Sequence, residues 1–187
     1  IIWHAFVTRD DVVLVERNCH KSILHAITMT GAIPVYLTGS RNDYGIIGPI
    51  SLDSFSPQSL RQRLAEHPLL QGRTPRIRLA VLTNSTYDGL CYNAELIKDE
   101  LEDAVDILHF DEAWYGYAAF HEFYAGRHGM GSKRGFERAR HPLVFATQSP
   151  HKVLAALSQA SIILAENSVE QQLDVERFNE SFMMHTS

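Results

Sequence analysis

The sequence contains the run Ile77-Arg78-Leu79-Ala80-Val81-Leu82-Thr83, whose apolar and β-branched residues extend over a length typical of one buried strand. A polar loop follows, and the segment Ala94–Ala104 has the acidic, amphipathic spacing of a helix through Leu96, Ile97, Leu101 and Val105. The next apolar run, Ile107–Phe110, is again short enough for a strand. A strand, a helix and a strand in this order predict a βαβ unit with parallel strands and a right-handed crossover.

The same alternation extends along the chain in both directions. Further strands are expected at Val12–Val15, Ile33–Leu37 and Leu143–Thr147. Helices are expected at 18–29, after Ser56-Pro57, and at 175–185 behind the cap Asp174. Ile1–Val7 fits a helix end or a strand, and the apolar runs at 153–157 and 160–164 fit two short strands or a turn and a strand. The predicted fold class is α/β, with a mostly parallel sheet flanked by helices.

Two polar side chains follow the ends of predicted strands. Asp111 ends the run beginning at Ile107, and Lys152 lies just past Thr147, behind Ser149 and His151. A desolvated lysine can attack a carbonyl as a free amine, and an aspartate can keep a pyridinium nitrogen protonated. Pyridoxal 5'-phosphate (PLP) enzymes use both groups together. Each residue taken alone also fits a simpler role, the lysine in a solvated loop and the aspartate as a helix cap or turn former.

The sequence motifs around these residues resemble those of a known family, the class I ornithine/lysine/arginine decarboxylases, which are PLP enzymes of fold type I. The resemblance spans essentially the whole chain. It is carried, in the family's order, by Asn18-Cys19-His20-Lys21-Ser22, Thr83-Asn84-Ser85-Thr86-Tyr87-Asp88-Gly89, Phe110-Asp111-x-Ala113-Trp114, Ser149-x-His151-Lys152 and Phe178-Asn179-Glu180-Ser181-Phe182-Met183-Met184-His185-Thr186.

The resemblance implies a role for each candidate site residue. Lys152 would carry the cofactor, Asp111 would contact the pyridine nitrogen, and His20 and Ala113 would lie on the two faces of the ring. Ser149 and His151 would contact the phosphate, and Trp114 would lie near the same pocket. Simpler alternatives remain for three of these residues: His20 as a helix cap, His151 as a structural hydrogen-bond partner and Trp114 as a core residue.

The activity implied is decarboxylation of a basic amino acid, arginine or lysine before ornithine, to an amine of polyamine metabolism and carbon dioxide. The run Asp111-Glu112-Ala113-Trp114-Tyr115-Gly116-Tyr117 looks more like the arginine-type branch, some of whose members prefer lysine. The resemblance also implies a homodimer with its site at the subunit interface, often assembled into a decamer. The alternatives are another fold-type-I PLP reaction, such as transamination, or a catalytically inactive fragment with a role in assembly.

The resemblance further implies that residues 1–187 are the PLP-binding large domain of a longer chain, between a wing domain and a C-terminal domain. The Ser and Thr loop with which the family binds part of the cofactor phosphate would precede residue 1. Pro150 departs from the family pattern, and it fixes one backbone angle and removes one amide donor beside the phosphate contacts.

Composition excludes several other classes of protein. The formal net charge of -5 argues against a nucleic-acid-binding surface, although Lys133, Arg134, Arg138 and Arg140 form a short basic loop. The two cysteines lack metal or disulfide spacing, so a reducing cytoplasm fits best, and no run has the length of a membrane helix. Pairs such as His109 with Asp111 and His121 with Glu122 do not have the spacing of a complete set of metal ligands, so no metal is expected.

Overall fold

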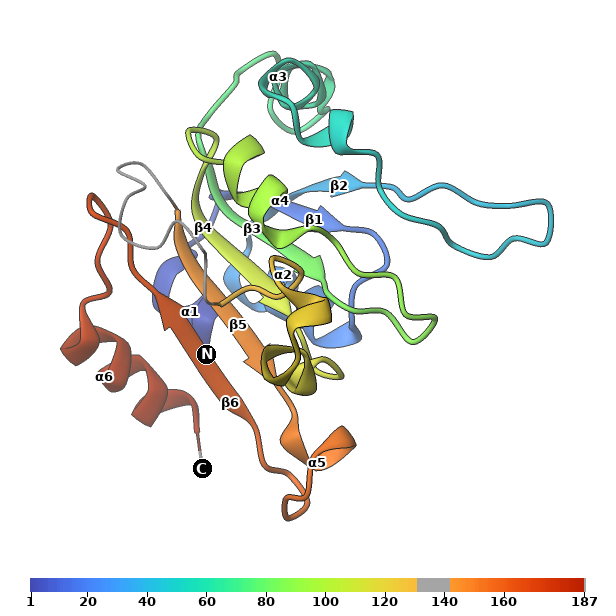
Figure 1. Cartoon of the computed structure of the whole chain (residues 1–187). Coiled ribbons are helices and arrows are strands. Elements are labelled where there is room, and N and C mark those ends of the chain that lie inside the picture. The colour runs from blue at the N-terminus through green and yellow to red at the C-terminus, as the bar shows by residue number, and fades with distance from the viewer. Residues whose placement is uncertain (131–141, 187) are drawn as a thin grey trace.

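The computed structural model describes residues 1–130 and 142–186 as a sheet flanked by helices on both faces (Figure 1). The basic loop residues Lys133, Arg134, Arg138 and Arg140 lie outside the described residues. The strands are β1 (Val12–Glu16), β2 (Ile33–Leu37), β3 (Ile77–Thr83), β4 (Val105–Asp111), β5 (Leu143–Gln148) and β6 (Ile162–Glu166). The α-helices are α1 (Ile2–Phe6), α2 (Lys21–Thr30), α3 (Pro57–Glu66), α4 (Ala94–Glu100), α5 (Pro150–Val153) and α6 (Val175–His185). Short 3₁₀ turns lie at Leu52–Phe55, Gly116–Phe120 and Glu122–Tyr124.

The described strands form one sheet in the order β2-β1-β3-β4-β5-β6, in which only β6 runs antiparallel to its neighbour. The predicted α/β class with a mostly parallel sheet is therefore confirmed. The chain moves from β1 outward to β2 and then crosses to the other side of β1 with β3. Loops after β1 and β3 consequently leave the sheet in opposite directions, and in open α/β sheets ligands bind at such a switch point.

Two apolar layers enclose the sheet, because alternate side chains of each strand face opposite ways. On one face Leu14 and Phe110 pack with Leu60 of α3 and Ile97 of α4. On the other face Val81 and Phe145 belong to the layer that includes Trp3 of α1, Ile23 of α2 and Phe178 of α6. The sheet is thus buried on both sides, which agrees with the near-continuous apolar character of its strands.

Several local predictions are confirmed by the helix ends. Residues 2–6 are helical, Ser56 caps α3 with Pro57 at its first position, and Asp174 caps α6. Gly31 ends α2 in the left-handed conformation at φ 74°, which a glycine adopts without steric cost. Of the two alternatives for the chain after Lys152, the structure has a turn followed by one strand, β6.

Two predicted helix boundaries were wrong. The helix predicted for Ala94–Ala104 ends at Glu100, because the parallel pairing of β4 with β3 already begins at Val105. Leu96, placed on the buried helix face by spacing, is 45% exposed. The helix predicted from Asn18 begins at Lys21, because the preceding residues form the turn that leaves β1.

Candidate active site

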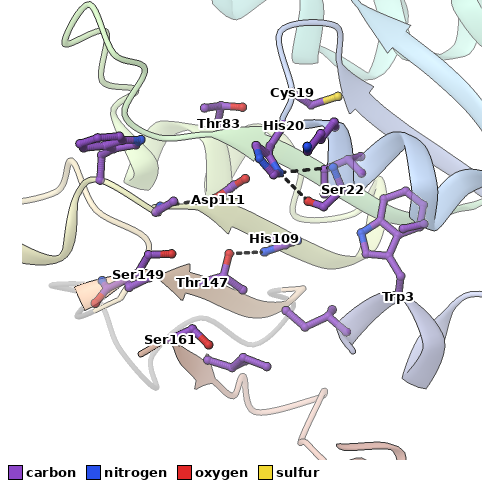
Figure 2. A pocket seen from close by; sticks show the side chains of 18 of the residues that line it. Trp3, Cys19, His20, Ser22, Thr83, His109, Asp111, Thr147, Ser149 and Ser161 are labelled. Carbon is purple, nitrogen blue, oxygen red and sulfur yellow. Dashed lines mark hydrogen bonds between the residues drawn. The ribbon is translucent and has the colours of Figure 1, made fainter. Parts of the chain in front are cut away.

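A cavity of about 770 Å³ opens where β3, β4 and β5 end, on the sheet face that α1 and α2 cover. Its lining includes six of the seven predicted site residues: His20, Asp111, Ala113, Trp114, Ser149 and Lys152. Figure 2 shows His20, Asp111 and Ser149 around this cavity, with Trp3 at its far end. Predicted residues from three separate segments of the sequence, 20, 111–114 and 149–152, therefore meet at one place, as their positions after strands predict.

Asp111 is the last residue of β4, and its side chain shares a face of that strand with His109. One carboxylate oxygen, Oδ1, accepts a hydrogen bond from the backbone N–H of Ala113 at 3.3 Å. In the described part of the chain no donor is bonded to Oδ2. Burial raises the pKa of Asp111, whereas the Ala113 hydrogen bond and the positive charges of His20 and Lys152 oppose this rise. Oδ2 of Asp111 is thus able to accept a hydrogen bond from a ligand in the cavity.

His20 lies at the N-terminus of α2 and caps it. Its Nδ1 accepts the backbone N–H of Ser22 at 3.3 Å and lies 2.9 Å from the Ser22 hydroxyl. The capping role that the sequence left open is therefore present. Because only Nδ1 is used in these contacts, they fix the ring while its face remains available to a planar ligand.

Lys152 is half-buried in the single helical turn α5, where its backbone N–H donates to the carbonyl of Ser149 at 3.0 Å. The backbone N–H of Ser149 in turn donates to the carbonyl of Ala113 at 3.3 Å, which joins the lysine turn to the aspartate segment. Pro150 is buried at the first position of the turn. A missing N–H costs nothing there, so Pro150 is compatible with this local geometry.

The remaining predicted residues divide into two groups. Ala113 and Trp114 line the cavity, and the Trp114 ring lies 5.2 Å from Nζ of Lys152. His151 does not line it: the side chain is exposed, and its Nδ1 lies 2.6 Å from the carbonyl oxygen of Ala160. His151 therefore makes a hydrogen-bond contact of the kind that the sequence left as an alternative, and its contact with a phosphate stays a prediction.

Sequence reasoning did not single out the polar residues that form the floor of the cavity. Nε2 of buried His109 lies 3.0 Å from the hydroxyl of Thr147, across the β4–β5 pair. Burial lowers the pKa of His109 to about 4, so the ring is neutral at physiological pH. His109 was considered only as a metal ligand, and the described residues contain no group of three or more side chains suited to a metal.

A second buried carboxylate, Glu16, supports the turn that carries His20. Its two oxygens accept the backbone N–H of Thr83 at 2.7 Å and the hydroxyl of Tyr92 at 3.0 Å. The Thr83 hydroxyl donates to the carbonyl of Asn18 at 3.0 Å. Burial raises the pKa of Glu16 to about 7 despite these donors. These hydrogen bonds join the end of β1 to the end of β3. The only feature of the sequence that pointed to Glu16 was its position as an acidic residue at the end of an apolar run.

Comparisons with known proteins identify the family. A model of the major domain of Orn/Lys/Arg decarboxylases matches residues 1–187. The chain belongs to the ornithine/lysine/arginine decarboxylase family. It is 65% identical over all 187 residues to a lysine decarboxylase of Pseudomonas aeruginosa and 47% identical to the biodegradative arginine decarboxylase of Escherichia coli. The chain spans 24% of the length of each of these relatives.

Solved structures of this decarboxylase family share the fold of the chain. Lysine decarboxylase A from P. aeruginosa superposes with a TM-score of 0.93 at 63% identity, covering 100% of this chain and 24% of that one. A PLP-bound putative aminotransferase from Clostridium difficile, at 8% identity, has a TM-score of 0.59 and covers 98% of this chain and 43% of its own. The predicted family and the fold-type-I architecture are confirmed. No helix in the described ranges combines the length and apolar character needed to cross a membrane.

Proposed function

We propose that this chain is the PLP-binding large domain, residues 1–187, of a longer decarboxylase that acts on lysine or arginine. The observation that supports this most is the meeting of Lys152, Asp111 and His20 in one cavity of a decarboxylase-family fold. The relatives with the highest identities quoted above are a lysine and an arginine decarboxylase. A homodimer or larger assembly in the cytoplasm, the reducing compartment suggested by cysteine usage, is part of the proposal.

The residues present fit PLP by the chemistry of their groups. Oδ2 of Asp111, free of described donors, can accept the proton of the pyridine nitrogen. His20 and Ala113 can bracket the ring, and Ser149 can donate its hydroxyl to the phosphate. When bound, PLP supplies an aldehyde that reacts with amines and a ring that accepts the electron pair left by departing carbon dioxide.

The protein's own contribution is orientation and proton placement. The Asp111 carboxylate would hold a proton on the ring nitrogen, and this positive charge would increase the electron demand of the ring. Lys152 would supply the amine that holds the cofactor. As a free amine beside Trp114, its Nζ would also be placed to donate a proton to the substrate carbon.

Borohydride reduction of the full-length protein with PLP tests the proposal. We expect a visible cofactor band that borohydride converts to a stable label on Lys152, found by peptide mapping. Lys21 is the matched control, because it also lines the cavity but lies at the start of α2. Lys21→Ala should retain the label and Lys152→Ala should lose it.

Carbon dioxide release from lysine, arginine and ornithine then identifies the substrate. We expect release from lysine or arginine to exceed release from ornithine. A label on Lys21, or the absence of a band in the wild-type protein, would reject the assignment of Lys152. A stable band with amino-group transfer and no carbon dioxide release would favour an aminotransferase.

A further inference from the structure

Glu112 is a buried carboxylate between two proposed cofactor contacts, Asp111 and Ala113. Its side chain is fully buried, with 0% exposure. Side chains alternate along an extended segment, so Glu112 projects to the sheet face opposite that of Asp111. Phe110, two residues earlier, packs in the layer of α3 and α4 on that opposite face. The proposed function gives this costly buried group no role.

Three hydrogen-bond donors converge on the two oxygens of Glu112. Oε1 accepts the side-chain Nδ2 of Asn84 at 3.0 Å and the backbone N–H of Gly129 at 2.6 Å. Oε2 accepts Nε2 of Gln148 at 3.2 Å. Burial raises the pKa of Glu112, and these three donors together with the charge of buried Lys98 oppose the rise. An ionised carboxylate matches this set, because it accepts at both oxygens.

Two of the three donors come from segments that line the cavity, and Gln148 itself is one of the lining residues. Asn84 directly follows β3, and Gln148 is the last residue of β5, next to Ser149. Glu112 itself directly follows β4, and its backbone N–H donates to the carbonyl of Thr147 at 2.9 Å. One side chain therefore joins the ends of three adjacent strands from the face opposite the cavity.

Close packing leaves these groups little freedom to move. A Cβ atom at Gly129 would lie 2.8 Å from Cδ2 of Phe110, so only glycine brings its N–H this close to Glu112 without displacing a neighbour. A Cβ atom at Gly116 would lie 3.2 Å from Oε1 of Gln148. The absence of a side chain at position 129 thus allows the N–H to reach Glu112, and its absence at position 116 leaves room for the Gln148 amide.

We propose that Glu112 is a positioning residue, whose carboxylate fixes the ends of β3, β4 and β5 and so fixes Asp111 relative to Lys152. This inference rests on the proposed decarboxylase function. An amide at position 112 would present its NH₂ group either to the NH₂ group of Gln148 or to the donors Asn84 and Gly129, so in either orientation a donor would face a donor. Errors of about 1 Å in the position of catalytic groups can lower rates about 100-fold.

A reciprocal exchange in the full-length holoenzyme tests the proposal. Glu112→Gln should lower kcat about 10- to 100-fold with little change in KM, and it should alter the circular dichroism of the bound cofactor. Gln148→Glu should be at least as damaging, because two carboxylates would then face each other. The double variant Glu112→Gln/Gln148→Glu restores one amide opposite one carboxylate. It should recover kcat to within about 3-fold of wild type and restore the dichroism.

The matched control is the exposed pair Gln62 and Glu66, joined by the same amide-to-carboxylate hydrogen bond at 2.8 Å. Glu66→Gln should leave kcat and the dichroism unchanged. If Glu112→Gln does not fold, Gln148→Met removes a single donor and should still lower kcat about 3- to 10-fold, the effect of one lost hydrogen bond.

The outcomes separate this inference from the function on which it rests. A wild-type protein without a cofactor band or carbon dioxide release would reject the proposed function. Active wild-type protein whose Glu112→Gln variant keeps kcat within about 2-fold would overturn the positioning role alone. A loss that the exchange does not rescue would also overturn it, because the carboxylate–amide pairing would not then be the cause.

Discussion

Nζ of Lys152 lies 5.2 Å from the centroid of the Trp114 ring, and the Tyr87 ring packs against the same indole in a T-shaped arrangement, with 5.0 Å between the ring centroids. An ammonium group over an indole face is attracted by about 0.5–1 kcal/mol at partly exposed sites. Trp114 follows Asp111 and Ala113 in the segment that leaves β4. Lys152, the proposed nucleophile, therefore contacts the same segment that carries Asp111, its proposed acidic partner. The aromatic pair thereby forms one wall of the cavity mouth.

Replacing Trp114 should weaken cofactor binding according to the aromatic character that remains. Trp114→Leu removes both the cation–π contact and the flat wall, so the Kd for PLP should rise about 5- to 30-fold, and Trp114→Phe should raise it at most about 3-fold. Absorbance titration of the full-length apoprotein measures both. Phe120→Leu alters an 81% exposed aromatic residue nearby in the chain and should leave the Kd unchanged. Equal Kd values for Trp114→Leu and wild type would contradict the expectation.

Asp111→Asn should separate activity from stability. The amide oxygen can still accept the Ala113 N–H, but it cannot hold a proton on the cofactor ring, so we expect kcat to fall about 100- to 10,000-fold. The melting temperature should stay the same or rise, because burial raises the pKa of Asp111 and thus makes its charged form costly. N-methyl-PLP carries a permanent ring charge and should restore part of kcat. Full activity of Asp111→Asn with ordinary PLP would rule out the proposed contact.

Glu16→Gln should change how stability depends on pH. The pKa of Glu16 is raised from 4.5 to about 7 in the folded protein, so the folded state holds this proton more tightly than the unfolded chain does. Its contribution to stability is greatest below pH 4.5 and is lost as pH rises to 7, by about 3 kcal/mol at most. The variant should therefore gain melting temperature relative to wild type between pH 5 and pH 8. If the difference in melting temperature between the variant and the wild type stayed constant from pH 5 to pH 8, the raised pKa of Glu16 would be contradicted.

His109→Gln should have the opposite pH dependence. The pKa of His109 is lowered from 6.5 to about 4, so the unfolded chain binds this proton more readily than the folded protein. Its contribution is fully present above pH 6.5 and is lost as pH falls to 4. Relative to wild type, the variant should become more resistant to unfolding as the pH is lowered through that window. His25→Gln, an exposed histidine on the same cavity, serves as the control and should follow the wild-type curve.

The sequence allowed the sheet to be predicted well, because buried parallel strands need short, continuous apolar runs and β1, β3 and β5 have them. The meeting of Asp111 and Lys152 followed from their positions at strand ends, since β4 and β5 are neighbours. The end of α4 was mispredicted because apolar spacing continued through Leu101 to Val105. Those two residues do pack in the same core layer, but from a turn and a strand.

The supporting carboxylates could not be found from sequence. Glu112 and Glu16 each terminate or follow an apolar strand, a position that is usually solvated. What makes them buried is the convergence of donors from residues 17 to 76 positions away, such as Gly129 and Tyr92. Such partners are defined only after the strands have paired. The antiparallel direction of β6 could not be predicted for the same reason, because a short apolar run does not show which strand it pairs with or in which direction.

The strand order affects how the sheet can form while the chain is being synthesised. From β3 onward, the parallel strands each pair with a free edge of the sheet that has already formed: β3 with β1, β4 with β3, and β5 with β4. A chain that leaves the ribosome from its N-terminus can therefore add strands one at a time without opening an existing pair. The aspartate strand is in place before the lysine turn is made. Under the proposed function, capture of the cofactor by Lys152 would therefore follow the synthesis of His20, Asp111 and Ala113.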